Sequence, residues 1–379
     1  MHIEPFEMER YQSLYWHRVE HDLSESGVRP MSIRDLLGPL ADAETFLATT
    51  RLGYPLSEGS EETRANIAEW YPGATTEHVT VVNGGSEANH LTLWSLLDPD
   101  DRLAFMLPNY LQGLGLGRAY AERTDTVRLR LRDGRWALDL EELERSVGKR
   151  TKVVMVCNPN NPTGAVLTES EMDAVIAVAS RVGAWIVADE IYRGAEVDSD
   201  ETSPTFWGRY DRVAVTSGLS KAFAMPGLRT GWVVAPPELI REIWAHHDYT
   251  TLTPGIVSDA LTALAMRPDV RENILVRTRG IIRSNLPALE GWLASHGELF
   301  AGVRPVAGAI RYASYDLPIG SRRLVDRIRE QVSVLLVPGK MFGLGRGIRF
   351  GFGFDIEHTM KGLARVDEVL AELLATGTA

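Results

Sequence analysis

Short runs of β-branched residues alternate with longer helical patterns through the middle of the chain. One helical pattern begins with Thr168 and Glu171 at capping-box spacing and ends before Gly183. Alternation of this kind builds a largely parallel sheet with helices on both faces, so the sequence predicts an α/β fold. Six runs are predicted as strands: 78–83, 102–107, 153–157, 185–189, 212–217 and 230–235.

The pattern becomes mainly helical after about residue 236, and short strand-like pieces and a last helix follow. This part predicts a smaller α+β domain. The first 45 residues hold one helical stretch and cannot form a core alone, so we expect them to pack on the smaller domain or on a partner chain. The predicted division is an N-terminal arm at 1–45, a large domain at 46–280 and a small domain at 281–379.

The composition excludes several classes of protein. A net charge of -11 without a basic run argues against nucleic-acid binding. The charged N-terminus resembles neither a signal peptide nor a membrane anchor, and no stretch of 18 apolar residues occurs. The single cysteine, Cys157, suits a reducing compartment. We therefore expect a cytoplasmic protein.

Ligands of doubly wound sheets bind at the carboxyl ends of the strands, and chemically useful residues follow several predicted strands. The stretch 83–87 (Asn-Gly-Gly-Ser-Glu) opens a helix, where free N–H groups can hold a phosphate, although a simple turn is the plainer interpretation. Tyr110 follows the next strand and can stack on a planar ring or simply pack. Asn161 lies in a rigid Asn/Pro turn and can aim its amide at a ring oxygen.

The remaining strand ends carry an acid and a lysine. Asp189 ends one strand and is either a helix cap or the partner of a cation. Lys221 follows another strand and is one of five lysines beside 35 arginines. Arginine keeps its proton at any useful pH, whereas a neutral lysine can attack a carbonyl, provided that its pKa falls well below the usual value of about 10.4. Together these groups meet the needs of pyridoxal phosphate.

The sequence resembles the class I/II aminotransferase family of fold-type I pyridoxal-phosphate enzymes over nearly its whole length. The resemblance implies an aspartate-aminotransferase-like fold, in which a large domain holds a mostly parallel seven-stranded sheet and a smaller α+β domain follows. The most specific segments are NPNNPTG (158–164), ADEIY (188–192) and SGLSKAFAMPGLRTGW (217–232).

The resemblance also implies a role for each matching residue. Lys221 would hold the cofactor as a Schiff base, and Asp189 and Tyr192 would complete the catalytic set. Many relatives have a serine where this chain has Gly218, so whether Ser217 or Ser220 contacts the phosphate stays open. The other cofactor-binding positions are Gly85, Ser86, Glu87, Tyr110, Asn161, Arg229 and Tyr54, and the substrate-binding positions are Arg349, Gly27 and Asn161.

The resemblance leaves the reaction open. The leading prediction is an aminotransferase that exchanges the amino group of an L-amino acid with a 2-oxo acid. The alternative is a lyase or cyclase of specialised metabolism, because segments such as LSESGVRP (23–30) are similar to capreomycidine synthases. Arg29 and Arg311 are candidates for binding a second substrate carboxylate. In relatives the counterpart of Tyr54 acts across a subunit boundary, so we expect a homodimer with shared active sites.

Overall fold

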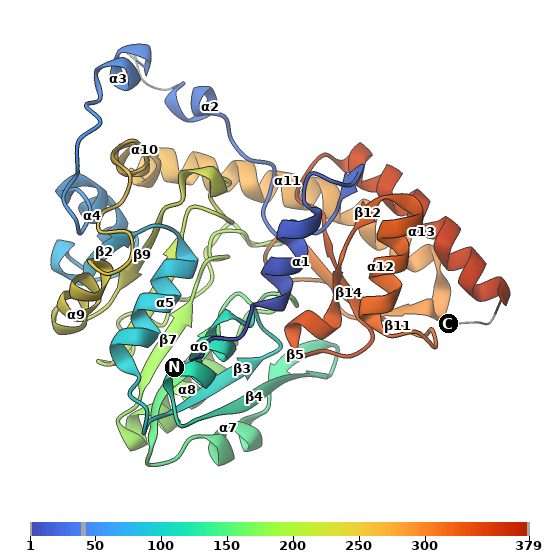
Figure 1. Cartoon of the computed structure of the whole chain (residues 1–379), viewed down its shortest axis with the longest axis horizontal. Coiled ribbons are helices and arrows are strands. Elements are labelled where there is room, and N and C mark those ends of the chain that lie inside the picture. The colour runs from blue at the N-terminus through green and yellow to red at the C-terminus, as the bar shows by residue number, and fades with distance from the viewer. Residues whose placement is uncertain (1, 39–42, 377–379) are drawn as a thin grey trace.

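The computed structural model describes residues 2–38 and 43–376. Its central sheet has eight described strands in the order β2-β9-β8-β7-β6-β3-β4-β5 (Figure 1). Strands β4, β3, β6, β7 and β8 are parallel, whereas β9 is antiparallel to both its neighbours and β5 is antiparallel to β4. The bounds are β2 Val79–Val82, β3 Arg102–Leu107, β4 Arg123–Arg132, β5 Arg135–Leu138, β6 Thr151–Cys157, β7 Trp185–Asp189, β8 Val213–Gly218 and β9 Gly231–Val234.

All six strands predicted from the sequence pattern are present, and β4 and β5 are additional to them. The resemblance implied a seven-stranded sheet, and the described sheet has eight strands. Both faces of the sheet are covered. Along β3, Leu103 and Phe105 join the core under α5, whereas Ala104 and Met106 join the core on the other face. Double-sided burial explains why these strands read as continuous apolar runs.

The capping signals of α8 are confirmed: Thr168 and Glu171 form a reciprocal capping box, and Gly183 ends the helix with φ of +71°. The helices around the central sheet are α4 Glu61–Ala68, α5 Gly85–Leu96, α6 Gln112–Tyr120, α7 Leu140–Ser146, α8 Glu169–Val182, α9 Pro237–His247 and α10 Ile256–Met266.

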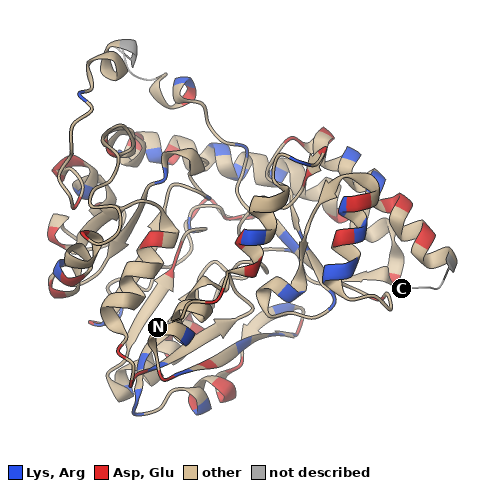
Figure 2. Ribbon diagram, viewed as in Figure 1, with Lys and Arg blue, Asp and Glu red and all other residues tan. Residues whose placement is uncertain are grey.

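The C-terminal part holds a second, antiparallel sheet in the order β10-β11-β14-β13. Basic and acidic residues are interspersed along α12 and α13 (Figure 2). The predicted boundary at residue 280 falls inside α11, and residues 1, 39–42 and 377–379 of the predicted domains lie outside the described residues, so the division stays a prediction. The bounds are β10 Phe300–Ala301, β11 Ile310–Tyr315, β13 Val337–Pro338, β14 Gly347–Gly351, α11 Pro268–Ser295, α12 Ser321–Val332 and α13 Ile356–Thr376.

The N-terminal segment lies on these C-terminal elements (Figure 1). On α1, the rings of Tyr11 and Tyr15 lie under the guanidinium groups of Arg322 and Arg329 of α12, at 4.6 and 3.8 Å. Strand β1 pairs with β12 in parallel, and the chain then runs beside β14. The bounds are α1 Glu7–Tyr15, β1 His21–Asp22, α2 Ile33–Leu37, α3 Ala43–Thr49 and β12 Val334–Leu335.

Residues 23–29 are held against β14 and the residues after it by backbone contacts. The N–H of Gly351 donates to the Leu23 carbonyl at 2.8 Å, and the N–H of Arg29 donates to the Gly353 carbonyl at 2.8 Å. A Cβ at Gly353 would collide with the Gly27 carbonyl and lie 2.7 Å from the Val28 Cα. The close approach of the two backbones therefore requires glycine at position 353.

We predict that Gly353→Ala destabilises the protein by about 1–3 kcal/mol, because the added methyl must push residues 27–28 away. Gly345→Ala is the matched control, since a Cβ there meets nothing within 4 Å, and it should change stability by no more than about 0.5 kcal/mol. Thermal melting of both variants beside the parent checks this prediction, and equal melting temperatures would contradict it.

Candidate active site

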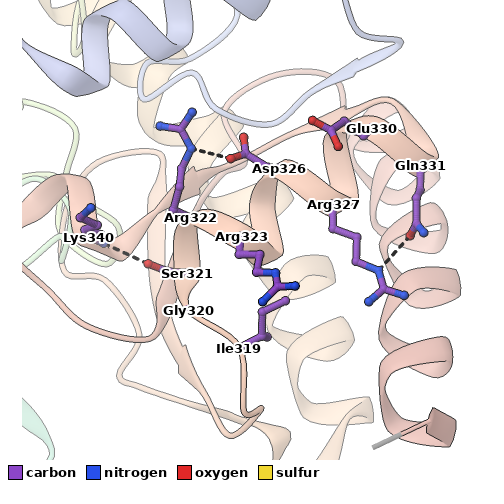
Figure 3. A pocket seen from close by; sticks show the side chains of 10 residues that line it. All are labelled: Ile319, Gly320, Ser321, Arg322, Arg323, Asp326, Arg327, Glu330, Gln331 and Lys340. Carbon is purple, nitrogen blue, oxygen red and sulfur yellow. Dashed lines mark hydrogen bonds and ion pairs between the residues drawn. The ribbon is translucent and has the colours of Figure 1, made fainter. Parts of the chain in front are cut away.

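A cavity of about 920 Å³ lies where the carboxyl ends of the parallel strands face β14 and the N-terminal segment. Ten residues that the sequence predicts as site residues line it: Gly85, Ser86, Tyr110, Asn161, Asp189, Tyr192, Ser220, Lys221, Arg229 and Arg349. A second cavity of about 750 Å³ lies along α12, lined by residues such as Arg323, Arg327 and Lys340, and includes none of the predicted residues (Figure 3).

Lys221 lies three residues after the end of β8, and its Nζ donates to the Oε1 of Glu25 at 2.8 Å. Burial lowers the pKa of Lys221, but the Glu25 carboxylate and Tyr192 raise it by more, so the pKa lies above its usual value. Burial raises the pKa of Glu25, and the attraction of Lys221 together with backbone N–H donors lowers it to about 2. The pKa of Lys221 was expected to fall below its usual value and instead lies above it, because of Glu25, which was not among the predicted site residues.

Asp189 is the buried last residue of β7. Its Oδ2 accepts from Asn89 Nδ2 at 2.9 Å, and its Oδ1 accepts from the N–H of Ile191 at 3.1 Å. Burial raises the pKa of Asp189, and these two hydrogen bonds lower it in part. No cationic side chain lies within ion-pair distance among the described residues, so the carboxylate suits a cationic ring nitrogen.

Asn89 is the second residue that the sequence analysis missed. It is buried on α5, and its Oδ1 accepts from Thr216 Oγ1 at 2.6 Å, which fixes the amide so that Nδ2 points at Asp189. The signal was an asparagine on the apolar face of a predicted helix, where a buried amide needs a polar partner.

Arg349 of β14 is almost fully buried. It donates to Asn161 Oδ1 at 2.9 Å and to the Ser24 carbonyl, whereas its Nε has no partner among the described atoms. Since Asn161 presents its oxygen to Arg349, its amide N–H₂ remains for a ligand. The hydroxyl of Tyr192 donates to Ser26 Oγ at 2.9 Å. The N-terminal segment therefore contacts both Arg349, through Ser24, and Tyr192, through Ser26.

The start of α5 forms a cradle for an anion. Its first turn leaves the N–H groups of Gly85 and Ser86 without acceptors inside the helix. The Arg229 guanidinium lies against Gly84, where a Cβ would come within 2.5 Å of its terminal nitrogen and φ is +101°. Ser220 lines the same cavity. A helix N-terminus beside an arginine suits a phosphate, so the residues present fit pyridoxal phosphate.

Four predicted residues do not line the cavity. The Glu87 carboxylate accepts from the Asn83 N–H at 2.6 Å and from Thr251, so it is engaged within the protein. The buried Ser217 directs its hydroxyl to the Glu190 carbonyl at 3.4 Å. Gly27 lies beside the stem of Lys221, and Tyr54 is 84% exposed on the surface.

Three more of the predicted residues, Tyr110, Arg311 and Arg29, were expected to contact the cofactor or the substrate. The hydroxyl of Tyr110 donates to Glu9 Oε1 at 2.9 Å, and its ring meets Phe6 edge-on. Arg311 is buried and paired with Glu290 at 2.7 Å, and Arg29 is exposed. Neither arginine lines the cavity, so neither provides a second cation there.

Comparison with known proteins assigns the family. The sequence profile of "Aminotransferase class I and II" matches residues 40–366. The chain belongs to this family. Capreomycidine synthase of Streptomyces vinaceus is 28% identical to it over 355 residues, 93% of this chain and 90% of that protein.

Two solved structures are similar along nearly the whole chain. A PLP-dependent aminotransferase from Streptococcus suis 89-1591 superimposes with a TM-score of 0.91 at 28% identity, covering 98% of this chain and 99% of that one. The PLP-dependent cyclase OrfR superimposes with a TM-score of 0.87 at 30% identity, covering 98% of each chain. The expected aspartate-aminotransferase-like fold is confirmed.

We predict that Asn89→Ala lowers stability in a pH-dependent way, because Asp189 loses a hydrogen bond that favours its ionised form. A carboxyl whose pKa is raised on folding costs stability as the pH rises above its unfolded value of about 4. The loss should therefore grow as the pH rises above about 4 and reach about 1–3 kcal/mol.

Thr92→Val is the matched control. Thr92 is buried on the same helix, and its hydroxyl has no partner among the described atoms. Melting temperatures of both variants measured against pH check the prediction, and a loss in Asn89→Ala that is the same at every pH would contradict it.

Proposed function

We propose that the chain is a pyridoxal-phosphate-dependent aminotransferase that binds its cofactor covalently through Lys221. The observation that carries the proposal is that one cavity brings together Lys221, the buried carboxylate of Asp189 and the buried guanidinium of Arg349. When bound, the cofactor would supply an electron sink for bonds at the substrate α-carbon. The family membership and the similarity to the Streptococcus suis aminotransferase support the same reaction class.

Each side chain then has a definite task. Asp189 would hold a proton on the ring nitrogen, since a buried carboxylate favours the protonated ring. Asn161 and Tyr192 would bond the ring oxygen. Arg349 would bind the substrate carboxylate through two parallel hydrogen bonds, and the Lys221 amine would accept and return the proton of the substrate α-carbon. The phosphate would be bound by Gly85, Ser86, Ser220 and Arg229, which line the cavity, and Gly27, beside the Lys221 stem, would lie next to the substrate.

A lyase or cyclase reaction is the second candidate. The similarity to capreomycidine synthase and to the PLP-dependent cyclase OrfR favours it, because both resemble this chain over more than nine-tenths of its length and a shared fold does not fix the reaction. Incubating the coloured protein with a panel of amino acids separates the two. A 2-oxo acid product and ping-pong exchange with an acceptor support the aminotransferase, whereas product released without an oxo-acid acceptor supports the lyase or cyclase.

We further propose a homodimer in the cytoplasm, in which Tyr54 reaches the phosphate of the neighbouring subunit. Tyr54 lies beside other exposed apolar residues along the chain, Leu52 and Leu56 at 85% and 58% exposure, which favours burial against a second copy. No described helix is long and apolar enough to cross a membrane.

We predict that Asp189→Asn retains the cofactor but loses at least about 100-fold in turnover, because an amide cannot hold the proton on the ring nitrogen. The visible absorbance of the purified variant measures retention of the cofactor, and initial rates with the best amino acid measure turnover. Near-parent turnover would refute this role of Asp189.

We predict complementation between Lys221→Ala and Tyr54→Ala. Neither variant alone should approach parent activity. If Tyr54 acts across the subunit boundary, mixed dimers formed by unfolding and refolding the two together carry one intact site, and a statistical mixture recovers about a quarter of parent activity. The controls are each variant refolded alone. Activity of the mixture equal to the mean of these controls would place Tyr54 outside the neighbouring site.

A further inference from the structure

The N-terminal segment places a carboxylate directly on the lysine of the proposed active site. Glu25 Oε1 lies 2.8 Å from Lys221 Nζ, and both side chains are 23% exposed within the cavity. Resting on the proposed function, we propose that Glu25 is the counter-ion of the Lys221 nitrogen. Its carboxylate stabilises a proton on that nitrogen and thereby sets the pH at which the nitrogen becomes neutral.

The proton stays on the Lys221 nitrogen, which donates to the carboxylate. The pKa of Glu25 is lowered to about 2 and that of Lys221 is raised, so Glu25 acts through its negative charge and not as a proton acceptor.

The Glu25 carboxylate is held in position before any reaction takes place. Besides Lys221, its Oε1 accepts from the N–H groups of Ser26 at 2.8 Å and Gly27 at 2.9 Å. The same segment is fixed to β14 through Leu23 and Gly351. Because backbone donors and a rigid strand hold the carboxylate, little reorganisation is needed when the Lys221 nitrogen gains or loses its proton.

The other charged groups around Lys221 do not replace Glu25. Tyr192, which follows β7, favours the protonated lysine, whereas Arg349 of β14 opposes it. Asp22 of β1 lines the cavity, but its carboxylate accepts from Ser24. Among the described carboxylates, Glu25 alone bonds to Nζ, which agrees with the raised pKa of Lys221.

A merely structural ion pair would hold the N-terminal segment in place and leave proton affinity at the lysine nitrogen unimportant for activity. The two roles are separated by titrating the visible absorbance of the bound cofactor, because this band reports protonation at the nitrogen that joins Lys221 to the cofactor. Removal of the Glu25 charge disfavours the protonated form. The midpoint of the titration should therefore move to lower pH.

The experiment compares the holoenzyme with Glu25→Gln, Glu25→Asp and the control Glu7→Gln. Glu7 lies on α1, pairs with Arg322 at 3.4 Å and is outside the cavity, so its variant removes the same charge from the same segment. We expect Glu25→Gln to lower the midpoint by at least about 1 pH unit and to reduce kcat by at least about tenfold with a smaller change in KM. Glu7→Gln should match the parent.

Glu25→Asp retains the charge but moves it away from Lys221 by one methylene, so the midpoint of its titration should fall by less than that of Glu25→Gln. If Glu25→Gln does not fold, Glu25→Asp provides the test. A midpoint that stays at the parent value in a folded Glu25 variant would overturn the proposal. Borohydride reduction distinguishes this failure from failure of the proposed function. A pyridoxyl group on the Lys221 peptide with an unmoved midpoint rejects Glu25 alone, whereas the absence of that group rejects the covalent role of Lys221.

Discussion

The carboxyl ends of β6, β7 and β8 lie at one edge of the central sheet, and the positions of Asn161, Asp189 and Lys221 depend on this constraint. Parallel pairing of buried strands aligns Asp189 with the turns that carry Asn161 and Lys221, although these residues are far apart in the sequence. The sheet supplies only one wall. The N-terminal segment and β14 close the opposite side with Glu25 and Arg349.

The ends of β6, β7 and β8 were predictable because each apolar run stops at a polar residue, and parallel strands buried on both faces give such runs. The strand β4 escaped prediction because only one of its faces is buried. Its alternating arginines read as a solvated stretch, although Asp133-Gly134 at the following turn is a recognised hairpin signal, with φ of +48° and +73°. The glycine-rich run at 113–117 lies on α6, where Gly113 leaves room for Phe105 and Met155.

Glu25 and Asn89 could not be placed from sequence for a different reason. The partner of Glu25 lies 196 residues further along the chain, and that of Asn89 lies 100 residues away. Local patterns predict an element and the face on which a residue lies, but a contact between residues far apart in the sequence follows only from tertiary packing. Lys221 itself was predictable, whereas the direction of its pKa was not, because the Glu25 carboxylate that raises it belongs to the N-terminal segment.

The site keeps charges that the protein does not fully compensate. Asp189 is buried without a cation among the described residues, and the Nε of the buried Arg349 lacks an acceptor there. Each such group costs stability, since burial of a charge is unfavourable unless it is paired. A ligand that brings a ring cation to Asp189 and a carboxylate to Arg349 removes both costs at once. Binding energy and folding stability are thereby linked, because whatever binds the folded chain alone stabilises it.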